Sequence, residues 1–197
     1  MSASTFERIK RSVFSKLKGL DPHLTYHCAE HTADVLEHTI RIADEEGIKD
    51  ERELFLLKVA ALYHDTGFLR TYANHEVKSC EIFHEDSEGF GFNEKDKALV
   101  ESLIMVTRVP QLPITLLEKI ICDADLDYLG RDDFFSIGDS LRKEFLWYKI
   151  VTDDEHWDQL QFRFLEKHEY HTQSSQNERT IAKRENYNKL IEMHDKR

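Results

Sequence analysis

The hydrophobic positions of the chain follow the pattern of helices rather than strands. From Leu54 to Tyr63 an apolar run is interrupted only by Lys58, and it ends directly before a histidine and an aspartate. No segment alternates with a period of two among β-branched residues, as a half-buried strand would. The pattern predicts helices over about 6–20, 26–46, 54–63, 74–86, 93–107, 113–129, 138–151, 153–172 and 177–194.

Capping signals agree with several of these boundaries. Ser4 or Thr5 can cap the first helix, Gly47 can end the second, and Gly67 breaks the chain after the third. The most polar connection, residues 171–179, is expected to be a surface loop before the last helix. Neither an internal repeat nor a low-complexity linker is visible, so the whole chain is predicted to form one all-α domain.

Composition limits the kinds of partner and the cellular location. The chain has 197 residues, of which 40% are hydrophobic and 33% charged, which suits a single buried core. The net charge of −11 argues against a nucleic-acid polymer as partner, although a metal ion can still supply positive charge for a small phosphorylated ligand. The three cysteines are far apart and lack CxxC spacing, which is typical of reduced thiols in a cytoplasmic protein. Neither a signal peptide nor a membrane span is predicted.

Groups that can carry chemistry occur in four places. The stretch "YHCAEH" puts His27 and His31 four residues apart, on one face of the predicted helix. His64 and Asp65 follow the apolar run, and a buried ionisable pair is costly unless each group finds a partner. His75 lies on the next predicted helix, and the stretch "CDADLDYLG" offers three aspartates near the end of another.

Helical geometry distinguishes these three aspartates. Asp125 shares its face with apolar residues such as Ile121 and Leu129, whereas Asp123 and Asp127 lie roughly opposite on a more mixed face. We therefore expect Asp125 to point toward the core, where a carboxylate requires a cation. Histidines and carboxylates that converge from three helices form a plausible nitrogen and oxygen site for a divalent metal ion. The absence of nearby thiolates argues against a structural zinc site.

Each of these residues also has a structural explanation. A lone histidine on a helix is more often a satisfied core or surface residue than a ligand, and Asp125 can instead cap a neighbouring helix. We expect His38, His84, His168 and His171 to be surface residues. The metal-site interpretation depends on the histidine spacing and the aspartate on the apolar face occurring together.

The motifs "YHxxxH", "HDxG", "HExxS" and "DADLxxLG", in this order, resemble those of the HD superfamily of metal-dependent phosphohydrolases. The chain looks most like the small bacterial stand-alone members. The likeness covers about residues 24–145, including "LRKEF" at 141–145. It implies an all-α HD-domain helical bundle, with additional C-terminal helices over about 146–197, in a single domain spanning residues 1–197.

The resemblance also implies roles for individual residues. His31, His64, Asp65 and Asp125 would hold a divalent metal ion, whose identity (Mn, Mg, Fe, Co, Ni or Zn) stays open. By similarity to the cyclic-nucleotide phosphodiesterase branch, His27 would donate a proton to the leaving oxygen, so His27 and Asp65 are the candidate catalytic residues. The implied reaction is hydrolysis of a phosphomonoester or phosphodiester in a small, nucleotide-like substrate by metal-activated water.

Other positions match more specialised relatives only in part. His75 sits where binuclear members place an extra ligand, but Thr107 and Arg108 stand where those enzymes have a further histidine. His75 is thus the candidate for a second metal, and Arg70, Lys78 and Arg108 lie within a few residues of the site elements, so they can hold a phosphate of the substrate or else are solvated. "HDTGF" lacks the lysine of cyclic-di-nucleotide phosphodiesterases, and the Glu-Asp pair of alarmone hydrolases is missing. These departures weaken both specialised activities.

Two other classes of function stay open. The chain can be an HD-domain binding or regulatory module with reduced catalysis. A di-iron oxygenase of the HD type is the weaker alternative, because it needs more histidines than the sequence offers. No membrane partner is expected, and the sequence leaves a homodimer open.

Overall fold

A computed structural model of the chain describes residues 3–196. Within this range all regular secondary structure is helical, which confirms the predicted class. The elements are α1 (Ala3–Leu17), α2 (Ala29–Glu45), α3 (Glu51–Tyr63), η1 (Thr66–Leu69), α4 (His75–Ser87), η2 (Glu88–Phe90), α5 (Glu94–Met105), α6 (Leu116–Asp125), η3 (Asp127–Gly130), α7 (Phe134–Trp147), α8 (Asp154–Lys167) and α9 (Gln173–His194), where η marks a 3-10 helix.

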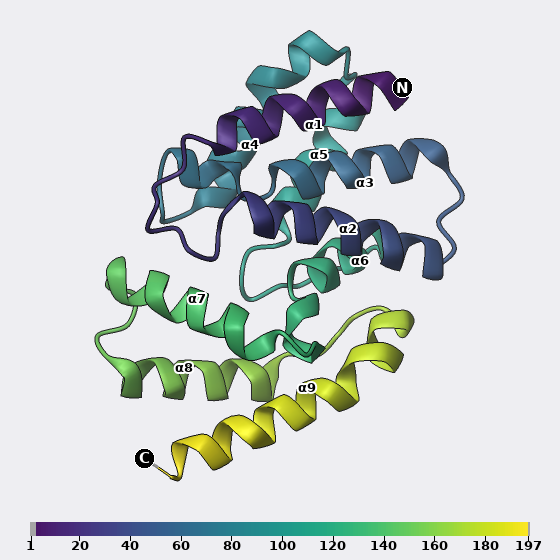
Figure 1. Cartoon of the computed structure of the whole chain (residues 1–197). Helices are drawn as coiled ribbons and strands as arrows, with labels where there is room; N and C mark the ends of the chain where they lie inside the picture. The colour runs from purple at the N-terminus through teal and green to yellow at the C-terminus, as the bar shows by residue number, and fades with distance from the viewer. Residues whose placement is uncertain (1–2, 197) are drawn as a thin grey trace.

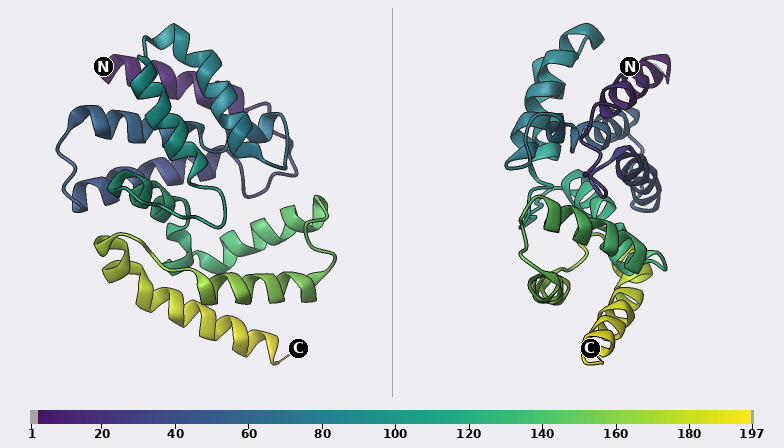
Figure 2. Two further views of the ribbon diagram at one scale, coloured as in Figure 1. Left: turned by 180° about the vertical axis from the view of Figure 1, so that it is seen from behind. Right: turned by 60° about the vertical axis from the view of Figure 1, so that its left-hand side comes forward.

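The helices form two layers (Figure 1). Helices α1 to α6 pack together as the N-terminal layer, and α7, α8 and α9 form a C-terminal layer against one side of it. The views in Figure 2 show that α1 and α9 lie at opposite ends of the molecule. The larger hydrophobic cluster fills the N-terminal layer, and a smaller one around Phe134, Leu165 and Tyr170 holds the C-terminal layer together.

Helix α3 lies at the centre of the N-terminal layer, in contact with α1, α2, α5 and α6. Eight of its 13 residues are buried, as expected for a helix that is apolar on most sides. Its first turn is capped by Asp50, whose side chain accepts hydrogen bonds from the backbone amides of Arg52 and Glu53. This rigid central helix fixes the positions of His64 and Asp65, which follow it directly.

The turn after α3 is held tightly against α4. The amide of Gly67 donates to Ser79 Oγ at 2.8 Å, and Ser79 Oγ donates to the carbonyl oxygen of His64 at 2.5 Å. A Cβ atom at Gly67 would lie only 1.8 Å from the carbonyl oxygen of His75, so this approach requires glycine. The sequence "HDTGF" therefore specifies a close contact between two backbones.

Two buried aspartates join the C-terminal layer to α6. Asp123 accepts hydrogen bonds from the amides of His171 at 2.8 Å and Thr172 at 2.7 Å, and Thr172 caps the start of α9. Asp127 pairs with Arg41 at 2.6 Å and with Arg179 of α9 at 3.0 Å. The Asp123 carboxylate on α6 is therefore hydrogen-bonded by the segment before α9, and the Asp127 carboxylate on η3 is neutralised by two arginines.

Helix α9 also approaches η3 at close range. A Cβ atom at Gly130 would lie 2.5 Å from the carbonyl oxygen of Arg179, so glycine is needed at this contact as well. The side-chain amide of Asn186 donates to the carbonyl oxygens of Leu129 and Arg131 at 3.1 and 3.0 Å. The segment after the last aspartate of "CDADLDYLG" is thus fixed against the last helix.

Two expectations about this region are wrong. Residues 171–179 are not a loop, because Thr172 caps α9 and the helix starts at Gln173. Asp125 is not the only one of the three aspartates that points inward, because Asp123 and Asp127, expected on a more mixed face, are fully buried. In both cases the cause is the C-terminal layer, which covers a face of α6 that looks polar when the helix is considered alone.

None of the described helices has both the length and the apolar character needed to cross a membrane. The three cysteines are free thiols, with Cys122 buried and Cys28 and Cys80 half-buried, which agrees with the sequence-based expectation.

Candidate metal centre

Four side chains converge where α2 meets the ends of α3 and α6, and we call them the His/Asp cluster. His31 Nε2 lies 3.4 Å from His64 Nε2. Asp65 Oδ2 lies 3.4 Å from His31 Nε2 and 3.2 Å from His64 Nε2. Asp125 Oδ1 lies 3.3 Å from His31 Nε2 and 3.6 Å from His64 Nε2. Two donor atoms bound at about 2.0–2.2 Å to neighbouring positions of one ion are about 3.0–3.6 Å apart. The spacing therefore fits a single divalent ion.

The contacts behind the cluster leave the facing atoms available. His64 Nδ1 lies 2.9 Å from the carbonyl oxygen of Ala61, an acceptor that places the ring proton on Nδ1 and leaves the Nε2 lone pair for a metal. Asp65 Oδ2 is buried beside His64 Nε2 at 3.2 Å and His31 Nε2 at 3.4 Å, so its negative charge faces two nitrogens that can ligate the same ion. His31, His64 and Asp65 each offer a ligand atom within 4.8 Å of the others. The residues present thus fit a divalent metal ion.

Electrostatic interactions within the cluster are strong. Burial by itself lowers the pKa of His31, but hydrogen bonds and charges from Asp125 and Asp65 raise it to about 10. Burial by itself raises the pKa of Asp65, but the charge of His64 and hydrogen bonds from the surrounding histidines hold it well below its usual range. Asp65 is therefore anionic. A divalent cation would bind the same histidine nitrogens that carry protons in its absence.

Asp125 has a second contact that ties it to the loop after α5. Its Oδ2 accepts a hydrogen bond from Gln111 Nε2 at 3.1 Å, while its Oδ1 faces the histidines. Gln111 Nε2 also donates to the carbonyl oxygen of Thr107 at 3.3 Å. This arrangement fixes the carboxylate orientation and leaves Oδ1 directed at the His/Asp cluster.

His27 lies beside the cluster but not on the helix that carries His31, contrary to the sequence-based expectation. Helix α2 begins at Ala29, because the backbone amides of Tyr26 and His27 donate to Glu144 Oε2 at 2.9 and 3.1 Å instead of entering the helix. The two imidazole rings still lie near each other, edge to face, with centroids 6.0 Å apart. The proximity expected from the spacing is present, although its structural cause is different.

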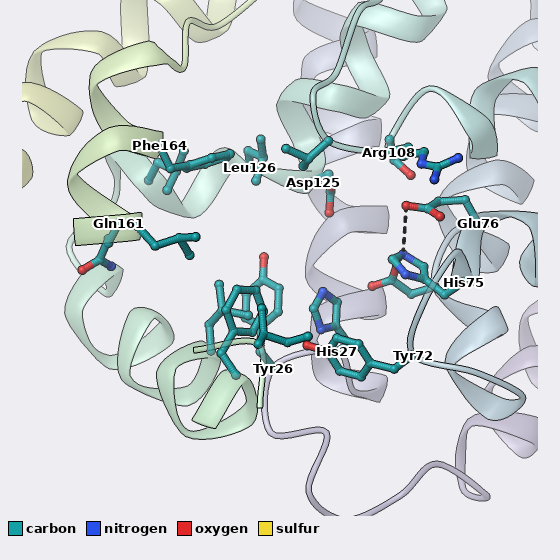
Figure 3. A pocket seen from close by; sticks show the side chains of 18 of the residues that line it. Tyr26, His27, Tyr72, His75, Glu76, Arg108, Asp125, Leu126, Gln161 and Phe164 are labelled. Atoms are coloured by element: carbon teal, nitrogen blue, oxygen red, sulfur yellow. Dashed lines mark ion pairs between the residues drawn. The ribbon is translucent and has the colours of Figure 1, made fainter. Parts of the chain in front are cut away.

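Glu144 of α7 is the residue that holds His27. Its side chain is fully buried, and its Oε1 contacts His27 Nδ1 in a short hydrogen bond and accepts from the Tyr72 hydroxyl at 2.9 Å. Burial by itself raises the pKa of Glu144, but His27 and the two backbone amides lower it. An anionic Glu144 therefore fixes Nδ1 of His27 and leaves Nε2 as the free ring nitrogen, and Figure 3 shows the ring beside Tyr72 at the wall of a cavity.

His75 reaches the cluster from α4. Its Nε2 lies 3.3 Å from Asp65 Oδ1 and 3.7 Å from Glu76 Oε1, the contact drawn in Figure 3. Asp65 thus faces histidines with both of its carboxylate oxygens. Glu76 is buried, and its Oε2 has no hydrogen-bond partner.

The three candidate phosphate-binding cations differ in position. Arg70 pairs with Glu81 and Glu85, and Lys78 pairs with Glu81, so both are engaged on the outer surface of α4 and neither lines the cavity. Arg108 does line the cavity and donates to Asn74 Oδ1 at 2.5 Å. Of the three, only Arg108 is placed to meet a ligand at the His/Asp cluster.

The cluster opens on a cavity of about 900 Å³ between the two layers, which we call the central cavity (Figure 3). Asp65, Asp125, His27 and His75 line one end. The opposite wall belongs to α7 and α8 and is made mainly of apolar and aromatic side chains. These are Leu141, Phe145, Trp157, Leu160, Phe164 and Leu165.

Sequence reasoning missed Glu144 and the apolar wall. A signal for Glu144 exists, because it continues the stripe of Phe134, Ile137 and Leu141 at helical spacing, just as Asp125 continues an apolar stripe on α6. No sequence signal identifies the apolar wall formed by α7 and α8, since its side chains have the pattern of core residues.

The four histidines expected at the surface also differ from one another. His84 is exposed as expected, with a side chain 54% accessible. His38 is largely buried, and its Nδ1 lies 3.3 Å from Asp127 Oδ2. His168 and His171 line a second cavity, between the loop after α5 and the start of α9. Tertiary packing by α9 accounts for these three departures.

Comparison with known proteins gives one family. A family model described as "HD domain" matches residues 28–127, which is just over half of the chain. Neither the comparison with curated proteins nor the comparison with solved structures returned a match. The match includes all four members of the His/Asp cluster, and it confirms the resemblance carried by the sequence motifs. The chain belongs to the HD domain family.

Proposed function

We propose that this protein is a metal-dependent phosphohydrolase that cleaves a phosphoester in a small, nucleotide-like molecule. One observation carries the proposal: two imidazole nitrogens and two carboxylates converge at the end of a large cavity. His31, His64, Asp65 and Asp125 would hold the divalent ion. When bound, such an ion acidifies water and polarises a phosphoryl oxygen.

His27 supplies the proton that the leaving oxygen needs. Glu144 fixes Nδ1 of His27, so Nε2 is the ring nitrogen that would deliver a proton into the central cavity. Arg108 lies on the same cavity wall and can neutralise a phosphate oxygen. The residues of the chain thus provide metal binding, proton donation and charge neutralisation around one point.

The central cavity supports a substrate of small size with an apolar part. Its volume of about 900 Å³ lies in the range of sites for small molecules. Aromatic side chains such as Trp157 and Phe164 offer surfaces on which a planar ring can pack. The chain's net charge of −11 disfavours a polymeric substrate.

The test measures metal content and phosphate release in the same set of variants. Asp65→Asn and Asp125→Asn keep the side-chain shape but remove a negative charge from the cluster, so metal affinity should fall at least about tenfold. Phosphate release from a panel of nucleotides, assayed with several divalent metals, should fall with it. Elemental analysis of the purified proteins reports the metal directly.

Asp123→Asn is the matched control, because it makes the same change two residues away on α6. Asp123 binds backbone amides and not the histidines, so the variant should keep its metal and lose thermal stability instead. The proposal is wrong if Asp125→Asn retains full metal and activity while Asp123→Asn loses both.

A further inference from the structure

A second cavity of about 520 Å³ lies beside the central cavity, between the loop after α5 and the start of α9. We call it the C-terminal cavity. It shares part of its lining with the central cavity, so the two cavities lie side by side. The shared residues are Val109, Leu126, Arg163, Phe164 and Lys167.

Three cations line the C-terminal cavity. Arg163 and Lys167 lie one turn apart on α8, and Lys119 faces them from α6. None of the three forms an ion pair with any residue that the structure describes, whereas the cavity's one acidic lining residue is Glu169. In a chain with a net charge of −11, three cations that line one cavity without an ion pair to a described residue give this cavity a positive local charge.

His168 adds a neutral hydrogen-bond donor to the same cavity. Burial, together with the charge of Lys183, lowers the pKa of His168 to about 3, so the ring is neutral near pH 7. Lys183 Nζ lies 3.4 Å from His168 Nδ1 and has only protons to offer, which places the ring proton on Nε2. That Nε2 atom is buried and has no partner within the described part of the chain.

The wall between the two cavities is apolar at its centre and polar at its edge. Leu126 and Phe164, shown close together in Figure 3, form the shared apolar part. Gln111 stands at the edge, where its Nε2 binds Asp125 of the His/Asp cluster and its buried Oε1 has no partner. A ligand that spans both cavities would therefore place an apolar group between two polar ends.

We propose that the C-terminal cavity binds a second phosphate group of the substrate, while the scissile phosphate lies at the His/Asp cluster. The substrate class is then a compact organic bisphosphate whose ring system packs between Leu126 and Phe164, such as a nucleoside 3′,5′-bisphosphate. This inference rests on the proposed function for the scissile end. The evidence for the second phosphate comes from residues that take no part in metal binding or proton donation.

Equilibrium binding tests the second phosphate without turnover. Metal-free protein is titrated calorimetrically with adenosine 3′,5′-bisphosphate, adenosine 5′-monophosphate and inorganic phosphate. Charge-assisted hydrogen bonds to the second phosphate should make the bisphosphate bind at least about tenfold more tightly than the monophosphate. In the double variant Arg163→Gln/Lys167→Gln this advantage should disappear, with monophosphate affinity within about twofold of wild type.

The matched control is Arg184→Gln/Lys189→Gln, which removes the same charge from exposed positions of α9 outside both cavities. This control should keep the full advantage of the bisphosphate. Equal affinities for the two nucleotides, or an advantage that survives in Arg163→Gln/Lys167→Gln, would overturn the inference. Inorganic phosphate that binds as tightly as the bisphosphate would also overturn it, because the cavity would then take a free anion.

The outcome is separable from that of the proposed function. If no nucleotide releases phosphate with any metal, yet the bisphosphate advantage is present and depends on Arg163 and Lys167, the anion site stands and the hydrolytic activity is wrong. If phosphate is released from monophosphates alone with no preference for the bisphosphate, the activity stands and the second phosphate is wrong.

Discussion

His168 shows how packing changes the chemistry of one residue. The sequence places it in a polar segment and predicts a surface position, yet its Nε2 is buried beside the base of α9. Burial and the neighbouring charge of Lys183 lower the pKa of this histidine from 6.5 to about 3. The folded protein therefore binds a proton at His168 much less readily than the unfolded chain does.

This difference predicts a pH-dependent contribution to stability. The contribution of His168 to the free energy of unfolding is fully present above pH 6.5. It is lost as the pH falls toward 3, because in this range the unfolded chain binds a proton at His168 and the folded protein does not. Between pH 8 and pH 5 the loss should be at most about 2 kcal/mol, and His168→Gln should remove it. Urea denaturation at the two pH values measures the free energy of unfolding. His84→Gln, a change at an exposed histidine, should keep the wild-type difference, and an equal effect of both variants would contradict the prediction.

The three aspartates of "CDADLDYLG" show what a single sequence can predict about individual residues. Helical periodicity directs Asp125 to the apolar side, and the structure places it 3.3 Å from His31. The same reasoning fails for Asp123 and Asp127, because both are covered by helices that lie far away in sequence. The spacing of residues in the sequence predicts the apolar face of a helix. It does not predict which distant segments pack against the opposite face.

Helix boundaries could be predicted where local signals decide them. The end of the central apolar helix before His64 agrees with the structure, whereas its start lies at Glu51, three residues before the predicted Leu54, because Asp50 caps it. The start of α2 could not be predicted, because the amides of Tyr26 and His27 bind Glu144, which follows them by 118 and 117 residues. Helix propensity depends on neighbouring residues and cannot predict hydrogen bonds to a residue so far away in the sequence.

Helix α7 supplies one side chain on which the proposed proton donor depends. Glu144→Gln keeps the volume of the buried side chain but removes the anion that contacts His27 Nδ1. We expect kcat to fall by about tenfold or more with KM little changed, because proton donation acts on the chemical step. Metal content should stay at the wild-type level, since Glu144 has no contact with the His/Asp cluster.

Tyr72→Phe is the milder comparison for this prediction. It removes one of the donors to Glu144 and leaves the contact with His27 in place. Its effect on kcat should be clearly smaller than that of Glu144→Gln. A Glu144→Gln variant that loses metal, or that changes only KM, would show that the residue supports the structure of the site and not proton donation.

At the scale of the whole molecule, buried polar contacts join the two layers. The Asp127 carboxylate forms ion pairs both with Arg41 of the N-terminal layer and with Arg179 of α9. Such contacts tie the folding of one layer to that of the other, because breaking them leaves a buried charge without a partner. We therefore propose that both layers form one domain, as expected from the sequence.

Unfolding measured with two probes tests this proposal. The chain has two tryptophans, Trp147 in α7 and Trp157 in α8, so their fluorescence reports on the C-terminal layer alone. Circular dichroism at 222 nm reports on the helices of both layers. The two denaturation curves should coincide, as for a single cooperative transition. Fluorescence that changes at a clearly lower denaturant concentration than the dichroism would show that the C-terminal layer unfolds independently.

The distance in sequence between His27 and Glu144 also sets an order of events during synthesis of the chain. All four members of the His/Asp cluster have been translated once Asp125 is added. Glu144 is the 19th residue to be added after Asp125. At about 5–20 residues per second, that interval lasts roughly 1–4 s. Each nascent molecule thus has its full set of metal-binding side chains before it has the carboxylate that positions its proton donor. A chain that terminates early within this interval would retain the cluster but have no residue to orient His27.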